Sequence, residues 1–130
     1  MHLIACIDSR GGMSFCGKRQ SMDSVLRADI INTTEGPIFM SEYSARQFEN
    51  EERIAVSDAA PEDGIYFIEN IDATPLLENA EKITLYCWNR AYPFDNSFPL
   101  SSLENGWSLA ESVEFVGSSH DKITKEVWTR

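Results

Sequence analysis

The chain has 130 residues, the length of one domain, and its 42% hydrophobic and 25% charged side chains are ordinary for a soluble globular protein. Its 11 basic and 21 acidic residues give a net charge of -10, which repels the phosphates of nucleic acids and the surface of anionic membranes. We therefore expect one domain over residues 1–130, with neither nucleic acid nor a membrane as a partner.

The cysteines indicate a reducing compartment, because they are three in number, far apart in sequence and without a C-x-x-C pair. Cys6 and Cys87 lie in apolar runs and are expected to pack in the core, whereas Cys16 lies in a loop and is expected to be exposed. The sequence shows neither a signal peptide nor an apolar segment long enough to span a bilayer. We predict a cytoplasmic protein.

The first thirty residues predict a strand, a loop and a helix. His2–Ile7 is a nearly continuous apolar run, typical of a strand buried on both faces, and Gly11 and Gly12 then let the chain turn. Ser21 is a suitable N-cap for the helix that follows. Apolar residues recur there with helical spacing and predict one buried stripe, formed by Met22, Val25, Leu26 and Ile30.

Asp23 lies in the first turn of this predicted helix, directly after the loop. A carboxylate in that position is well placed to meet a ligand held between loop and helix. It could equally complement the helix dipole and pair with Arg27, four residues further on. The sequence leaves both interpretations open.

The rest of the chain predicts an α/β sheet with an antiparallel end. Strands are expected at residues 37–40, 53–56, 64–68 and 83–88, and helices at residues 42–50 and 74–80. Residues 107–116 and 122–128 alternate apolar with polar side chains, as in two antiparallel strands joined near residues 117–119. The order is that of a mixed sheet flanked by helices and closed by a hairpin.

This order of elements resembles the dihydrofolate reductase family from one end of the chain to the other. The landmarks are residues 3–8 followed by Gly11-Gly12-Met13, Ser21-Met22-Asp23, residues 37–40, Tyr43-Ser44, Asp95 with Phe98-Pro99, and Trp107-Ser108-Leu109. The resemblance implies a dihydrofolate-reductase-like fold with a mobile substrate loop near its start. It also implies that Asp23 lies at or near the acid that binds the substrate.

The departures from the family fall where it binds NADPH. Ser41 and Glu42 stand in place of a glycine and a basic residue, and a carboxylate there repels phosphate. Glu69 and Asn70 replace a Gly-Gly turn that lets the pyrophosphate approach the backbone. The chain also runs from residue 56 to residue 64 without the strand and helix that form much of the adenosine side of the site. We infer that standard NADPH binding is lost.

The candidate site combines Asp23 and Glu69 as acid–base residues, with Glu42 as a third acid. The alternative is that Glu69 and Glu42 are exposed acids of an acidic protein. Residues 18–21 could clamp an anionic group against the helix N-terminus, or form a solvated basic loop. The remaining predicted contacts are Cys6, Met13, Lys18, Arg19, Arg27 and Tyr86 toward a substrate, and Ser41, Glu42, Ser44 and Asn70 toward a cofactor.

No metal site is predicted, and His2 and His120 are too isolated in sequence to suggest a metal site or a catalytic dyad. His120 is expected in the turn of the hairpin. Three functions follow from this reading. The first is a shortened, divergent protein with a pterin- or nucleotide-like ligand and no standard NADPH chemistry, and the second is a working NADPH-dependent reductase. The third is a non-catalytic subunit whose exposed sheet edges are covered in a homodimer.

Overall fold

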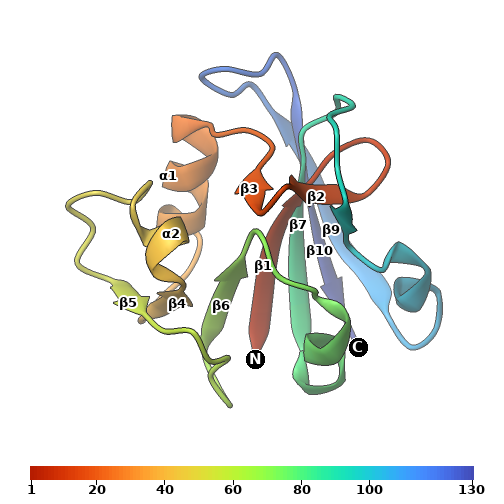
Figure 1. The fold of residues 1–130 in the computed structure, drawn as a ribbon. Coiled ribbons are helices and arrows are strands. Elements are labelled where there is room, and N and C mark those ends of the chain that lie inside the picture. Colours follow the sequence, from red (N-terminus) through yellow and green to blue (C-terminus); the bar gives the residue numbers. More distant parts are fainter.

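A computed structural model describes all residues from 1 to 130 and contains a seven-stranded mixed sheet (Figure 1). The strand order is β5-β4-β6-β1-β7-β10-β9. The first five of these strands are parallel, and β10 and β9 close the sheet as an antiparallel hairpin. Their bounds are β1 His2–Ile7, β4 Ile38–Met40, β5 Ile54–Val56, β6 Ile65–Ile68, β7 Lys82–Cys87, β9 Ser108–Phe115 and β10 Ile123–Thr129. The predicted fold class and hairpin are confirmed.

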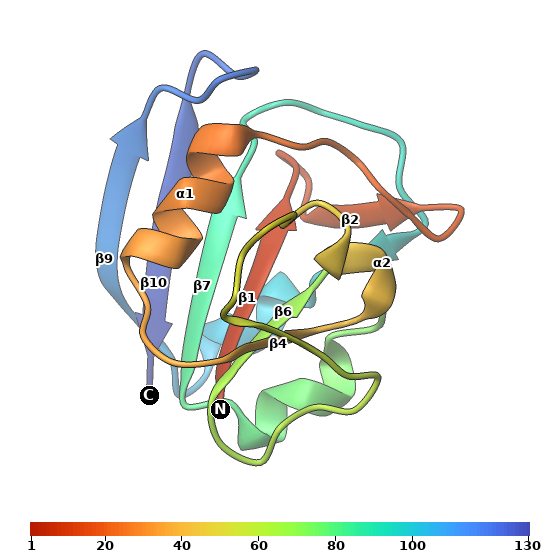
Figure 2. The same ribbon diagram turned by 90° about the vertical axis from the view of Figure 1, so that its left-hand side faces the viewer.

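Strand β1 divides the core into two halves because its successive side chains point to opposite faces of the sheet. Leu3, Ala5 and Ile7 belong to the apolar cluster on one face, and Ile4 belongs to the cluster on the other. Helices α1 (Ser24–Asn32) and α2 (Glu42–Ala45) cover the Ile4 face (Figure 2). The short 3₁₀ helices η1 (Thr74–Asn79) and η2 (Leu100–Glu104) contribute to the opposite cluster.

A second, three-stranded sheet lies beyond the first loop and was not predicted. It pairs β2 (Gly12–Phe15) with β3 (Lys18–Arg19) on one side and with β8 (Asn96–Ser97) on the other. Gly11 turns the chain into this sheet with a φ of 84°. At Gly12 a Cβ atom would lie 2.5 Å from the Phe94 ring, so only glycine fits there. The residues expected to form a mobile loop are therefore held in a hairpin.

Three predictions about the helices are wrong. Asp23, not Ser21, is the N-cap of α1, and of the predicted stripe only Leu26 and Ile30 are buried, whereas Met22 is 48% exposed. Helix α2 ends at Ala45 instead of continuing to residue 50, because a series of turns follows it. The predicted helix was too long because its polar residues fit a helix surface and a solvated turn equally well. None of the helices is long and apolar enough to cross a membrane.

The parallel strands β1, β6 and β7 end at the same edge of the sheet (Figure 1). The residues that follow them, Asp8, Glu69 and Trp88, are all buried. In open α/β sheets this edge is where ligands bind. The candidate functional site is therefore expected at this edge.

Candidate functional site

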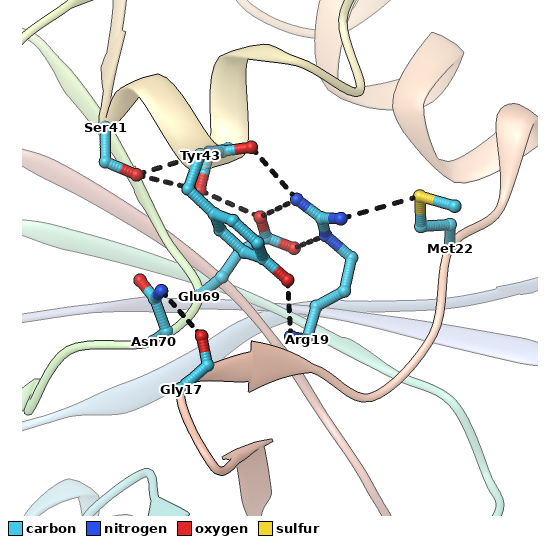
Figure 3. A network of polar contacts seen from close by, with 8 residues as sticks. Gly17, Arg19, Met22, Ser41, Tyr43, Glu69 and Asn70 are labelled. Atoms are coloured by element: carbon cyan, nitrogen blue, oxygen red, sulfur yellow. Dashed lines mark hydrogen bonds and ion pairs between the residues drawn. The ribbon is translucent and has the colours of Figure 1, made fainter.

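A buried ion pair between Arg19 and Glu69 lies at this edge of the sheet. Glu69 follows β6, and Arg19 reaches it from β3. The guanidinium donates from Nε to Glu69 Oε2 at 2.9 Å and from Nη2 to Oε1 at 3.1 Å (Figure 3). The side chain of Arg19 is 18% exposed and that of Glu69 is 6% exposed, so water screens this pair little. Two parallel hydrogen bonds fix the plane of the guanidinium.

Helix α2 and the turn after β6 hold this pair in place. The Ser44 hydroxyl donates to Glu69 Oε1 at 2.8 Å, and the Arg19 guanidinium lies over the Tyr43 ring, 4.2 Å from its centre. Ser41 caps α2 by accepting from the Ser44 backbone N–H. The Asn70 amide donates to the Gly17 carbonyl at 2.9 Å, which ties the β2–β3 hairpin to the turn after β6 (Figure 3). Arg19, Glu69, Ser41 and Ser44 were each predicted to contact a ligand, but in the structure they contact one another.

The space beside the ion pair is small. A cavity of about 10 Å³, room for one water molecule, lies among residues that include Cys6, Met13, Gln20, Glu69 and Trp88. Burial raises the pKa of the Cys6 thiol well above its usual range, and the nearby Glu69 carboxylate raises it further. Cys6 is therefore a protonated, apolar wall of the cavity.

Asp23 is the second predicted acid, and its carboxylate does not line this cavity. It is 2% exposed and accepts five hydrogen bonds. The donors are the backbone N–H groups of Val25, Leu26, Ser118 and Ser119, and the His120 ring. The expectation that this carboxylate lines an open cleft is wrong, because the β9–β10 loop covers it.

The same contacts hold Asp23 ionised. Burial alone would raise the pKa of Asp23, but the hydrogen bonds from His120 and from backbone N–H groups outweigh burial and hold that pKa well below its usual range. Gly117 makes this approach feasible, since a Cβ there would overlap the Asp23 carboxylate. The predicted pairing with Arg27 does not form. Instead, Asp23 pairs with His120, whose Nδ1 lies 3.0 Å from Oδ2.

His120 is the residue that sequence reasoning missed. It is 4% exposed, stacks on Trp88 with 4.4 Å between ring centres, and has the hydroxyls of Ser21 and Tyr92 at 3.0 and 3.2 Å from Nε2. It does lie in the loop of the hairpin, as predicted. No local pattern could reveal its partner, because Asp23 and His120 are 97 positions apart.

The remaining predicted residues lie away from the ion pair. Glu42 is 78% exposed and pairs on the surface with Arg46 at 3.8 Å. Lys18 is exposed, and Tyr86 is buried beneath α1, where its hydroxyl donates to Asp29 at 2.7 Å. Burial and this hydrogen bond raise the pKa of Tyr86. The predicted clamp of an anion by residues 18–21 is not formed, since Glu69 holds Arg19 and Asp23 caps α1.

A larger groove lies between α1 and the turns after α2. Its volume is about 600 Å³, within the range of small-molecule sites. The lining residues are Met22, Arg27, Ala28, Ile31, Arg46, Gln47, Phe48, Glu49, Asn50 and Glu51. Gln47 contributes a buried Nε2 donor that has no hydrogen-bond partner. The groove continues toward the ion pair, since Met22 Sδ is 3.8 Å from Arg19 Nη1.

The sheet order and the hairpin define the fold of dihydrofolate reductase, and the resemblance inferred from the sequence is confirmed for the fold. The chain is similar to the structure of dihydrofolate reductase from Enterococcus faecalis complexed with NADP(H) and RAB-propyl. The TM-score is 0.71, the sequence identity is 12%, and the match covers 99% of this chain and 95% of that chain. No protein-family model matches the sequence, and neither does any curated protein.

Proposed function

We propose that this protein is a divergent dihydrofolate-reductase-like protein that binds a pterin- or nucleotide-like small molecule and does not use NADPH in the manner of that family. The observation that carries the proposal is the contrast between the 600 Å³ groove beside α1 and the 10 Å³ space beside Glu69. A ligand of that class fits the first space and no dinucleotide fits the second.

The groove combines apolar surface with charged groups of both signs. Phe48, Met22 and Ile31 supply apolar surface, and Arg27 and Arg46 supply positive charge at a place where a carboxylate or phosphate group can reach them. The unpartnered Gln47 Nε2 is a donor for a ring nitrogen or carbonyl oxygen. Glu49 and Glu51, also on the groove, suit the amino groups that pterins and nucleobases carry.

The residues at the cofactor position do not fit a pyrophosphate. The Glu69 carboxylate is buried there, and a neighbouring phosphate would have to displace Arg19 or lie against a negative charge. Glu42 adds an exposed carboxylate at the place expected for a phosphate-binding cation. The runner-up, a working NADPH-dependent reductase, requires both obstacles to be removed when the cofactor binds.

Thermal unfolding and calorimetry with a panel of ligands test the proposal. A pterin, a folate or a nucleotide at about 100 times its dissociation constant should stabilise the protein by roughly 2.7 kcal/mol, and NADPH at millimolar concentration should leave the melting temperature unchanged. Arg27→Ala should weaken the active ligand, whereas Arg90→Ala, which changes an exposed arginine outside the groove, should not. A saturable shift with NADPH would support the runner-up.

A double substitution tests whether the two acids alone prevent NADPH binding, or whether the missing strand and helix also do. Glu42→Arg with Glu69→Gly removes both acids from the cofactor position, yet we expect no NADPH-dependent reduction of dihydrofolate, since residues 57–63 still replace a strand and a helix. Measurable turnover in this variant would show that charge alone opposed the cofactor.

The third candidate, a non-catalytic homodimer, depends on the sheet edge that β5 leaves open. Val56 is 60% exposed on that strand, and unpaired edge strands invite pairing with another chain. Sedimentation of the full chain would show a dimer if a second copy covers this edge. Val56→Lys should then release the monomer.

A further inference from the structure

Outside the proposed groove, three side chains form a connected hydrogen-bonded series. Asp23 Oδ2 lies 3.0 Å from His120 Nδ1, and His120 Nε2 lies 3.0 Å from Ser21 Oγ. This is the connectivity by which an acid, an imidazole and a hydroxyl activate a serine nucleophile. We propose that Ser21 is such a nucleophile, that His120 is its general base, and that the protein cleaves small carboxylic esters.

The protonation of the ring follows from its partners. An ionised carboxylate only accepts hydrogen bonds, so His120 Nδ1 carries the proton that faces Asp23. In the neutral ring, the lone pair of Nε2 faces two hydroxyls, that of Ser21 at 3.0 Å and that of Tyr92 at 3.2 Å, and Ser21 is the nearer of the two. Trp88, stacked 4.4 Å from the imidazole, and the backbone donors on Asp23 keep the ring from turning. Asp23 is thus a positioning residue for the base.

Ser21 is the accessible member of the series. The side chains of His120 and Asp23 are 2% and 0% exposed, whereas Ser21 is half-buried and lines the 10 Å³ cavity beside Trp88. A second cavity of about 340 Å³, which Phe15, Lys18 and Tyr92 help to line, shares Arg19 and Gln20 with the first. The cavity that Ser21 lines holds only one water molecule, so an ester carbonyl would have to reach Ser21 from its exposed side, with the alcohol part in the larger cavity beside Gln20.

The reaction balances in two steps. Ser21 Oγ bonds to the carbonyl carbon while its proton passes to His120 Nε2, and the alcohol leaves with that proton as the ester C–O bond breaks. Water then gives a proton to His120 and attacks the acyl–Ser21 carbon, which releases the carboxylic acid and returns the proton to Ser21. The Tyr92 hydroxyl, 3.2 Å from the same nitrogen, is the neighbouring donor for the oxyanion.

The purely structural alternative is that the series only fastens the β9–β10 loop to the start of α1. Both interpretations require Asp23 and His120, but only catalysis requires the Ser21 hydroxyl to be more reactive than other serines. Ser24 is the matched control, because it is three residues away, is exposed, and uses only its backbone N–H, which donates to Ser118.

The test exposes the full chain to diisopropyl fluorophosphate and to p-nitrophenyl acetate, with the modified residue located by peptide mass spectrometry. Phosphorylation of Ser21 with loss of fluoride is expected, together with p-nitrophenol release that Ser21→Ala lowers by about 100-fold or more, as His120→Gln should too. Ser24→Ala should match the wild-type rate. Circular dichroism shows that each variant is folded.

The role of Asp23 needs a readout that loop fastening alone does not move. Asp23→Asn should favour the opposite ring tautomer, so the folded variant should lose most of its reactivity and respond differently to pH. The location of the adduct in the wild-type chain decides the question even where a variant fails to fold. An adduct on any residue other than Ser21, or a wild-type rate equal to that of Ser21→Ala, would overturn the proposal.

Discussion

The two buried acids of this fold, Asp23 and Glu69, are stabilised in different ways. Four of the five donors to Asp23 are backbone N–H groups, whereas Glu69 is held only by the side chains of Arg19 and Ser44. Backbone donors are present whenever the chain is folded, but side-chain donors can turn toward a ligand. Asp23 is therefore part of the architecture, and Glu69 is the acid whose partner a ligand could replace.

The largest expected effect is the loss of stability when Asp23 is removed. Asp23→Ala removes a helix cap and leaves His120 and four N–H groups without their acceptor. We expect a loss of about 3 kcal/mol or more in the free energy of unfolding, because each buried donor left without an acceptor costs roughly 1 to 3 kcal/mol and the lost helix cap adds about 1 kcal/mol. Urea denaturation measures it, with Asp121→Ala, an exposed acid in the same loop, as the control.

The dependence of stability on acid pH gives an independent measure of how much Asp23 stabilises the fold. The folded pKa of Asp23 is depressed, so its stabilisation is complete above the unfolded pKa of about 3.9 and is lost as the pH falls toward the folded value. Asp8, whose pKa is also lowered, adds to the loss in the same window. Asp23→Asn should flatten the decline below pH ~4. An unchanged slope would mean that Asp23 is not held as the structure indicates.

The Arg19–Glu69 pair should respond less strongly. Arg19→Ala leaves Glu69 with Ser44 alone, at an expected cost of about 1 to 3 kcal/mol, because Arg19 is partly exposed and water can reach the space it vacates. Adding Glu69→Gln should recover part of that loss, and the double-mutant cycle gives the coupling energy. Lys18→Ala is the control. A coupling energy near zero would show that the Arg19–Glu69 contact does not stabilise the folded chain.

The sequence predicted the long strands of the fold but missed the short ones. Strands β1 and β7 and the C-terminal hairpin were predicted correctly, because continuous apolar runs and alternation are local signals that burial enforces. The β2–β3–β8 sheet was missed, since β3 and β8 are two residues long and too short for any periodicity. Those strands form because the fold brings distant loops together.

The sequence named residues for the candidate site, but it could not predict which of these residues contact one another. The sequence analysis assigned Glu69 to acid–base chemistry, Arg19 to a substrate and Ser44 to a cofactor, whereas in the structure these three side chains bind one another. The sequence predicted Asp23 inside the first turn of α1, but Asp23 is the N-cap that precedes this turn. At the N-cap, its carboxylate points toward the β9–β10 loop, where the Ser119 backbone N–H donates to it. Such a shift lies within the uncertainty of any helix boundary.

His2 is a third titratable group, a partly buried base without a counterion. Burial, with Lys82 and Lys125 nearby, lowers the pKa of His2 to about 4, so the ring is neutral in the folded chain near pH 7. The unfolded chain takes up a proton below about pH 6.5, which favours unfolding as the pH falls from 6.5 to 4. His2→Gln should remove this slope, at most about 1.4 kcal/mol per pH unit, from urea midpoints measured between those two values.

The smallest expected effect concerns Glu42, the acid that the sequence grouped with Asp23 and Glu69. Its carboxylate is 78% exposed and pairs with Arg46 one helical turn away, at 3.8 Å. Such exposed i,i+4 pairs contribute about 0.3 to 0.5 kcal/mol, so Glu42→Gln should change the urea midpoint barely beyond error. Glu69→Gln, the matched change at the buried site, should cost clearly more, because it leaves the Arg19 guanidinium without its counterion. Equal costs for the two substitutions would mean that Glu69 is as solvated as Glu42, and that a dinucleotide phosphate meets no fixed charge at the end of β6.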